Sequence, residues 1–184
     1  MGIVVSTDGG KNWTQIPISA QSGSESSVAA VAPSNANYLY VGGVDSDWKA
    51  LIYKSANGGA TWTAITNGIS NQPLWIAVDP QDPNIVYIVT YDGVWRSSNG
   101  GGSWTKYVPS KAWGFRAVAV NKDNPNQVFV GYSRGVFYSQ DRGLTWTDVS
   151  AGLIVPDVNQ LYFNSANSTL YVGTEGGGIW KRTF

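Results

Sequence analysis

The chain has 184 residues, of which 12 are basic and 12 acidic, and it contains no histidine and no cysteine. These absences exclude a Ser-His-Asp triad, a thiol nucleophile and any metal site built from imidazole or thiolate ligands. The balanced charge excludes the basic surface that a phosphate backbone or an anionic membrane would need. A metal could be held only by oxygen ligands, which means calcium or magnesium. We expect no cofactor, no metal, no nucleic acid and no membrane among the partners of the chain.

The predicted elements begin with a strand at residues 2–6, followed by an eight-residue pattern that returns three more times. The pattern is Ser-x-Asp/Asn-x-Gly-x-Ser/Thr/Asn-Trp, and its starts are 49, 42 and 42 residues apart. Turn-forming residues stand between two segments of strand composition, so each octet predicts a hairpin turn. The four octets are Ser6–Trp13, Ser55–Trp62, Ser97–Trp104 and Ser139–Trp146.

A second pattern recurs between the octets. Each copy has a short apolar strand, a turn rich in Asp or Asn with Pro, and an alternating second strand. A third strand then leads into the octet, and a fourth begins at the octet tryptophan. Four antiparallel strands per 42 residues are typical of one β-propeller blade. The copies of the second pattern are residues 30–42, 77–89, 119–131 and, in shorter form, 162–172.

The octet resembles the Asp-box, also called the bacterial neuraminidase repeat (BNR). This repeat is found in sialidases, in xyloglucanases of tandem propeller build, in sortilin-type receptors and in photosystem assembly factors. The segments Gly93–Ser97 and Leu170–Gly178 most resemble the xyloglucanase-type and assembly-factor propellers. The resemblance covers the whole chain. It implies one all-β domain at residues 1–184, a propeller of four-stranded antiparallel blades with four blades or a partial fifth. The chain is either the whole domain or an excised or engineered piece of a larger propeller.

The acidic position of the octet is amide in two copies, so it does not require negative charge. A side-chain oxygen that accepts N–H groups of the turn is sufficient, and Asp and Asn share it. We expect the tryptophans to pack under the hairpins and between blades. Both positions are interpreted as structural, rather than catalytic or calcium-binding, and the resemblance places them away from the usual ligand side. These residues are Asp8, Trp13, Asn57, Trp62, Asn99, Trp104, Asp141 and Trp146.

The sequence predicts five strands of the third position in a blade but only four of each other position. The N-terminus supplies a third and a fourth strand, whereas the C-terminus supplies a first, a second and a third. We expect a single closed ring, in which the strands near 159–173 pair with the N-terminal hairpin. Such closure removes exposed strand edges. The alternative is that two copies join their incomplete edges into a larger ring. A monomer is therefore expected, with a homodimer by edge pairing or strand exchange as the alternative.

Loops that join second to third strands and fourth to first strands are expected to gather on one side of the propeller, where ligands bind. Three tryptophans on this side, Trp48, Trp75 and Trp113, occupy positions that the repeat does not conserve from copy to copy. With neighbouring loop residues they predict an aromatic and acidic lip suited to stacking on sugar rings. The alternative is that Trp75 caps the channel and the other two tryptophans cover blade edges. The predicted binding residues are Trp48, Trp75, Tyr91, Trp113, Tyr132 and Arg134, beside the carboxylates Asp45, Asp47, Asp92 and Glu175.

Glycoside hydrolysis needs two carboxyl groups about 5–5.5 Å or 6.5–9.5 Å apart. Five acidic residues lie in the loops, and their spacing in the sequence does not indicate which two would form a catalytic pair. They are Asp45, Asp47, Asp92, Asp157 and Glu175. The arginine clamp implied by a resemblance to sialidases needs three arginines, but only Arg116 and Arg134 lie on this side. We therefore predict a non-catalytic scaffold or binding module, with carbohydrate or protein as its ligand. The alternative is a glycoside hydrolase, or a truncated piece of one, that uses Asp45, Asp47, Asp92 or Glu175.

The sequence says little about compartment. The N-terminus lacks the pattern of a signal peptide, and no apolar run approaches the 18 residues of a spanning helix. The triplets Asn12-Trp13-Thr14 and Asn167-Ser168-Thr169 match the acceptor pattern for N-glycans. An extracellular or periplasmic location is favoured for a natural protein of this kind.

Overall fold

The structure is a computed structural model that describes residues 1–19, 23–109, 112–154 and 157–184. It contains five antiparallel sheets in chain order, of which the middle three have four strands each. The first of these three is formed by β3 (Glu25–Val31), β4 (Leu39–Val44), β5 (Ala50–Ser55) and β6 (Thr63–Ala64). The second is formed by β7 (Pro73–Val78), β8 (Val86–Thr90), β9 (Gly93–Ser97) and β10 (Thr105–Tyr107). The third is formed by β11 (Ala117–Val120), β12 (Val128–Tyr132), β13 (Gly135–Ser139) and β14 (Thr147–Asp148).

The two end sheets are incomplete. The N-terminal hairpin has only β1 (Gly2–Val5) and β2 (Thr14–Pro17), which correspond to a third and a fourth strand. The last sheet has β15 (Val158–Asn164), β16 (Thr169–Thr174) and β17 (Gly178–Thr183), which correspond to a first, a second and a third strand. A single 3₁₀ turn, Ser165–Asn167, is the helical element of the described residues. Nothing in those residues is a helix long and apolar enough to cross a membrane.

The core lies between successive sheets. The second strands β4, β8 and β12 are buried along their whole length, because each is covered on both faces by neighbouring sheets. Three apolar clusters result, one at each junction from β3–β6 to β15–β17. Two buried tyrosines also reach across a junction: the hydroxyl of Tyr40 donates to the carbonyl of Pro83 at 2.7 Å, and that of Tyr87 donates to the carbonyl of Arg142 at 2.9 Å.

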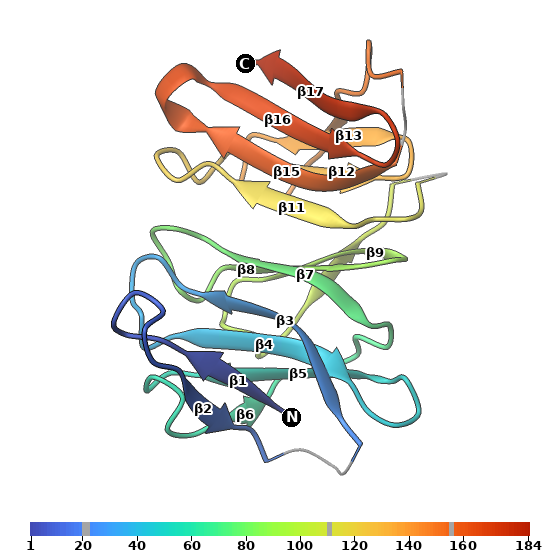
Figure 1. Ribbon diagram of the computed structural model, residues 1–184. Coiled ribbons are helices and arrows are strands. Elements are labelled where there is room, and N and C mark those ends of the chain that lie inside the picture. The colour runs from blue at the N-terminus through green and yellow to red at the C-terminus, as the bar shows by residue number, and fades with distance from the viewer. Residues whose placement is uncertain (20–22, 110–111, 155–156) are drawn as a thin grey trace.

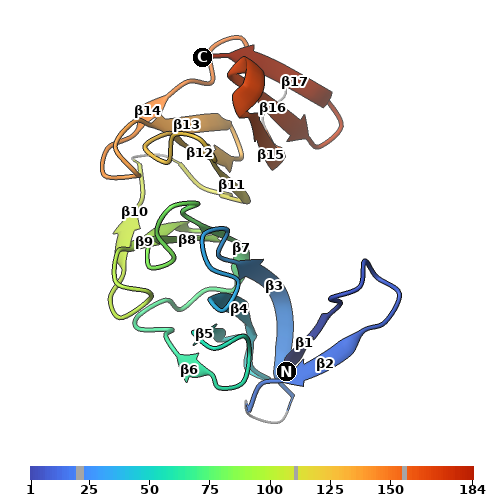
Figure 2. The same cartoon turned by 90° about the vertical axis from the view of Figure 1, so that its left-hand side faces the viewer.

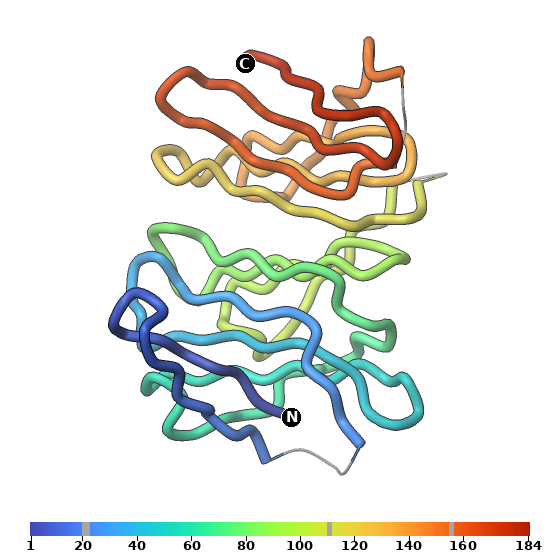
Figure 3. The backbone as a smooth tube through the Cα atoms, in the orientation of Figure 1, coloured from blue at the N-terminus to red at the C-terminus, as the bar shows by residue number. Residues whose placement is uncertain are grey.

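The sheets are arranged as the blades of a propeller. They stack from the N-terminus to the C-terminus (Figure 1), and the turned view shows that they follow an arc with the two termini at opposite ends (Figure 2). The first strands β3, β7, β11 and β15 contact one another in sequence and line the inner side of the arc. The tube view shows the same up-and-down meander in each blade (Figure 3). The predicted all-β propeller fold is confirmed.

The predicted closure into a single ring of four blades is wrong. The edge of β16 that the N-terminal hairpin was expected to use is occupied by β17, in register from Thr169–Thr183 to Thr174–Gly178. Strand β1 pairs only with β2 within the described part of the chain. The physical reason is locality: β16 and β17 are joined by a short turn, so their pairing costs far less loop entropy than pairing the two ends of the chain.

Candidate functional site

The loops and the octets lie on opposite sides of the molecule. The second-to-third and fourth-to-first loops emerge on the right in Figure 1, whereas the octet hairpins, such as the one between β1 and β2, lie on the left. This is the arrangement that the strand order predicted. The loop side is therefore where candidate binding residues from different blades come together.

The four octets share one hydrogen-bond pattern. In every copy the first serine accepts the N–H of the fifth residue at 2.8 Å and donates to the Asp or Asn Oδ1 at 2.8–2.9 Å. The same Oδ1 accepts the N–H of the seventh residue at 2.8–2.9 Å. Asn57 and Asn99 thus accept the same bonds as Asp8 and Asp141, and the turn works without charge. The described residues hold no group of three acidic side chains that would suit a metal ion.

The octet tryptophans differ in burial. Trp62, Trp104 and Trp146 are half-buried, and the Trp104 indole donates to the carbonyl of Ile65 in the preceding blade at 2.8 Å. Trp146 stacks on Tyr107 of the preceding blade with centroids 5.4 Å apart. Trp13 is 63% exposed, contrary to the packing expected from the sequence, because no blade precedes it in the described chain.

The loop side carries an aromatic pair on two neighbouring loops. Tyr91, in the β8–β9 loop, and Trp113, in the β10–β11 loop, have ring centroids 6.1 Å apart and are 48% and 54% exposed. Their backbones are fixed: Gly114 donates to the carbonyl of Tyr91 at 3.0 Å, and the hydroxyl of Ser133 donates to the carbonyl of Trp113 at 2.8 Å. The loop that carries Trp113 is therefore held between two neighbouring blades. The structure brings these two predicted residues together.

Asp92 lies beside this pair but is already bound. It forms an ion pair with Lys106 and accepts the hydroxyl of Thr90 at 2.7 Å. Burial alone would raise the pKa of Asp92, but hydrogen bonds from Lys106, Thr90 and Asn71 outweigh it and lower the pKa. The Lys106 ammonium also lies 5.0 Å from the centre of the Trp95 ring. Lys106 was missed by the sequence reasoning, because it belongs to a fourth strand and only the fold brings it to the loop.

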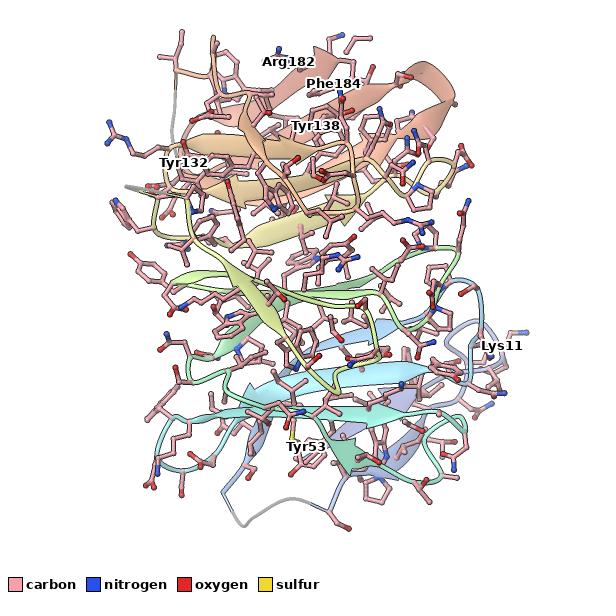
Figure 4. All side chains as sticks on the ribbon, turned by 180° about the vertical axis from the view of Figure 1, so that it is seen from behind. Lys11, Tyr53, Tyr132, Tyr138, Arg182 and Phe184 are labelled. Atoms are coloured by element: carbon pink, nitrogen blue, oxygen red, sulfur yellow. The ribbon has the colours of Figure 1, made fainter. Side chains whose placement is uncertain are left out.

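Tyr132 and Arg134 line a hollow next to the loop that carries Trp113. Tyr132, labelled in Figure 4, lies on the third complete blade. It is 6% exposed and stacks on Phe137, so its ring is not the exposed surface that the sequence predicted. Its hydroxyl donates to Asp148 at 3.0 Å. The exposed Arg134 borders a hollow of about 460 Å³ lined also by Pro109, Ala112, Asp148 and Ser150. Asp148 is a second site residue that the sequence did not indicate.

Trp48, Asp45 and Asp47 form a separate loop on the first complete blade. Trp48 is 71% exposed with a positive φ of 62°. Asp45 accepts the N–H groups of Asp47 and Lys49 at 2.9 Å each, so it caps its own loop. Asp47 lies 3.5 Å from the Lys49 ammonium, with both side chains exposed. The described contacts of this loop link it to no other residue of the predicted lip.

The two remaining predicted residues lie apart from the aromatic pair. Trp75 is half-buried on the inner strand β7 and packs against the cluster between the second and third complete blades. The exposed Glu175 lies in the β16–β17 loop, where its N–H donates to the carbonyl of Asp157 at 2.8 Å. The fold thus brings the loops of Glu175 and Asp157 together, which spacing in the sequence could not show.

A scan of family models matches residues 4–15 and 137–148, both described as BNR/Asp-box repeat. Two of the four octets, Ser6–Trp13 and Ser139–Trp146, therefore match the BNR/Asp-box repeat. Solved structures agree: the GH74 enzyme of Niastella koreensis is 26% identical with a TM-score of 0.67, covering 88% of this chain and 28% of that one. An ancestral GH74 enzyme is 25% identical with a TM-score of 0.71, covering 90% and 23%. The chain spans about a quarter of the length of these two enzymes.

A third solved structure, YCF48 from Cyanidioschyzon merolae, is 13% identical with a TM-score of 0.56, covering 94% of this chain and 59% of that one. It shares the fold alone. Together the repeat matches and these neighbours confirm the predicted Asp-box propeller family. No curated protein sequence matches the chain.

Proposed function

We propose that this chain is a non-catalytic β-propeller module that binds carbohydrate on its loop side, with Tyr91 and Trp113 as the stacking surface. The observation that carries the proposal is the half-exposed aromatic pair, with ring centroids 6.1 Å apart on a backbone fixed by two neighbouring blades. A sugar ring can bury its C–H face on such rings while its hydroxyls stay in water. Prior fixing of the loop backbone lowers the entropy cost of binding.

The ion pair and hydrogen bonds of the loop carboxyl groups support a non-catalytic function. Asp92 is paired with Lys106 and has a lowered pKa, so it is a poor general acid. Asp45 is occupied by N–H groups of its own loop. Retaining and inverting hydrolases both need two carboxyl groups placed for one glycosidic bond. Asp92 is held in its ion pair, and Oδ1 of Asp45 is held by N–H groups of its own loop, which disfavours both for that role.

The alternative function is glycoside hydrolysis, which is favoured by the two GH74 neighbours and by the hydrogen bond between the Glu175 and Asp157 loops. Incubation with xyloglucan and other soluble β-glucans, followed by a reducing-end assay, separates the two functions. We expect no hydrolysis above a blank without protein. Turnover that is lost in Glu175→Gln would establish the alternative.

Binding is measured by calorimetric titration of the chain with oligosaccharides from the same β-glucans. We expect Trp113→Ala to weaken binding about tenfold or more, which is the loss typical of a central aromatic contact. The matched control is Leu144→Ala, because Leu144 is an exposed apolar residue (67%) on an octet, far from the loop side. Trp48→Ala tests whether the site extends to the first complete blade. Unchanged affinity in Trp113→Ala would contradict the proposal, as would the absence of binding by the unchanged chain.

A further inference from the structure

A hollow of about 410 Å³ lies between the octet hairpins of the first and second complete blades. It is on the side of the octets, at the left in Figure 1, and all of its lining residues belong to these two blades. The first hairpin and the last sheet therefore take no part in it. The polar side chains that line it are Lys54, Asn57, Thr61, Thr63 and Asn99.

The ammonium group of Lys54 forms no ion pair with an acid in the described part of the chain. It lies 5.0 Å from the centre of the Tyr38 ring and donates to the side-chain oxygen of Asn84 at 3.3 Å. Asp82, in the same turn as Asn84, accepts two N–H groups of Asn84 and does not line the hollow. Burial lowers the pKa of the Lys54 amine. An ammonium carries three donors, so Lys54 retains donors for a ligand.

The junction between the second and third complete blades shows the same positions with balanced charge. There the residue equivalent to Lys54 is Arg96, whose Nε donates to the carbonyl of Arg142 at 2.6 Å. The guanidinium of Arg142 lies 3.3 Å from the fully buried Asp79, and the octet carries Asp141. Two arginines and two aspartates thus occupy this junction.

At the junction of Lys54 both acidic positions are uncharged. The position equivalent to Asp79 is Ala32, and the octet position equivalent to Asp141 is Asn99. The octet arginine is also replaced, by Gly100. Lys54 is therefore the one charged side chain among the described residues that line the hollow.

The octet amides add further donors. The Oδ1 atoms of Asn57 and Asn99 accept N–H groups of their own octets at 2.9 Å. Each amide nitrogen donates one N–H to the hydroxyl of the seventh octet residue, Thr61 or Ser103, and retains a second N–H. The described lining of the hollow is thus positively charged, rich in donors and without a carboxylate.

We propose that this hollow binds a phosphate or sulfate group, either as the free ion or carried by a sugar. Lysine binds such a group as a point charge, whereas a planar carboxylate is better matched by the paired N–H groups of arginine. A tetrahedral anion offers acceptors in several directions to the lysine, the two octet amides and the hydroxyls of Thr61 and Thr63. Asn in place of Asp at these two octets keeps the turn and removes the charge that would repel an anion.

The first test is a titration with sodium phosphate or sodium sulfate at constant ionic strength, followed by NMR of the amide groups. We expect saturable shifts at Asn99, Gly100 and Gly102, with a dissociation constant of about 1 mM or less, and none at the equivalent Gly143. Glucose 6-phosphate, with glucose as the neutral control, separates the two sources. Tighter binding than that of phosphate indicates a group carried by a sugar, and equal or weaker binding indicates the free ion. Shifts at these residues that do not saturate would overturn the proposal.

The sharpest variant changes the charge of the hollow and keeps the turns. Asn57→Asp combined with Asn99→Asp should retain the turn hydrogen bonds, because Asp8 and Asp141 form the same bonds in their octets. We expect it to weaken phosphate binding about tenfold or more. The matched control is Asn126→Asp, the same exchange at an exposed residue outside the hollow, and it should bind as the unchanged chain does. Unchanged affinity in the double variant would contradict the proposal.

A second pair of variants changes the lysine. Lys54→Ala should weaken binding about tenfold or more, whereas Lys54→Arg keeps the charge and should retain most of the affinity. The control is Lys122→Ala, because Lys122 is an exposed lysine that pairs with Asp123 elsewhere on the surface. Circular dichroism checks that each variant is folded. If Lys54→Ala does not fold, Lys54→Arg and the double asparagine variant still decide the question.

These tests are independent of the proposed carbohydrate site, because Tyr91 and Trp113 lie on the loop side. Trp113→Ala should leave phosphate binding unchanged, and loss of oligosaccharide binding alone in this variant would establish two separate sites. A chain that binds oligosaccharides but neither phosphate nor sulfate would remove the anion site and leave the carbohydrate proposal in place.

Discussion

The three complete blades and the two end sheets contain equivalent residues in different surroundings. The octet hydrogen bonds of the exposed Ser6–Trp13 hairpin have the same partners and nearly the same lengths as those of Ser97–Trp104. Burial differs instead: Trp13 is exposed and Trp104 is half-buried against the preceding blade. The comparison teaches that the octet folds from its own residues, whereas stability comes from the packing of one blade on the next. Paired substitutions at equivalent positions test this division.

The largest difference is expected for the tyrosine of the second strand that pairs with a basic residue of the third strand, as Tyr87 does with Arg96 and Tyr171 with Lys181. Tyr87 is fully buried and donates to Arg142, so Tyr87→Ala should lower the free energy of unfolding by about 3–5 kcal/mol. Tyr171 is only half-buried and lines an open hollow, so Tyr171→Ala should cost about 1 kcal/mol. Urea denaturation of the two variants beside the unchanged chain measures both losses. Equal losses would mean that the end sheet is packed as tightly as the centre.

A second comparison uses the fifth octet residue, a glycine with positive φ in each blade. Gly101 has φ of 91°, and a Cβ there would lie 2.4 Å from Ile65 Cδ1 in the preceding blade. Gly10 has φ of 86°, and its nearest neighbour would be Trp13 Cζ2 at 3.8 Å. Both alanine variants bear the left-handed strain of about 1–2 kcal/mol, but Gly101→Ala adds overpacking of about 1–3 kcal/mol. Under the same denaturation conditions, a Gly10→Ala loss as large as that of Gly101→Ala would contradict this assignment.

A smaller difference is expected for the first octet serine. Ser97 is 1% exposed, and its hydroxyl accepts the N–H of Gly101. Ser97→Ala leaves that buried N–H without a partner, so the free energy of unfolding should fall by about 1–3 kcal/mol. At Ser6 water can replace the lost hydroxyl, so Ser6→Ala should cost about 0.5–1 kcal/mol. Thermal unfolding of the two variants side by side gives the comparison, and a larger loss in Ser6→Ala would reverse it.

The features that were predicted correctly from the sequence are those determined by residues close together in the chain. The octets, the strand order and the side on which the loops lie follow from turn residues and from a 42-residue period, and the structure reproduces them. The pairing of the two end sheets could not be predicted in the same way. Both β1 and β17 have the pattern of a third strand, so either could pair with the edge of β16. The sequence pattern does not rank them, and the structure shows the local pairing with β17.

The candidate site was predicted in part. Tyr91 and Trp113 were recognisable because they depart from the repeat in adjacent loops, and the fold brings them together. The ion pair of Asp92 with Lys106 and the burial of Tyr132 against Phe137 were not predictable. Both depend on which strand residues face a loop, and that is set by the register of the strands and by the stacking of blades.

The smallest expected effect is on acid sensitivity, and it separates the octets that carry Asp from those that carry Asn. Hydrogen bonds from the side chain and backbone of Thr145 lower the pKa of Asp141 to about 2 from an ordinary 3.8, and the backbone of Asn12 does the same for Asp8. The unfolded chain takes up these protons at higher pH than the folded chain. The stabilisation is therefore complete above about pH 4 and is lost as the pH falls toward 2.

Asp141→Asn should leave stability at pH 7 nearly unchanged, because Asn99 accepts the same turn N–H groups, and should flatten the loss of stability between pH 4 and 2. Urea midpoints measured from pH 7 to 2 test this. Asp8→Asn should flatten the curve less, since a terminal hairpin with an open edge frays before the blades unfold. If both variants keep the slope of the unchanged chain, the carboxylates of the octets do not contribute to its acid sensitivity. If Asp8→Asn has the larger effect, the hairpin is as firmly held as the central blades.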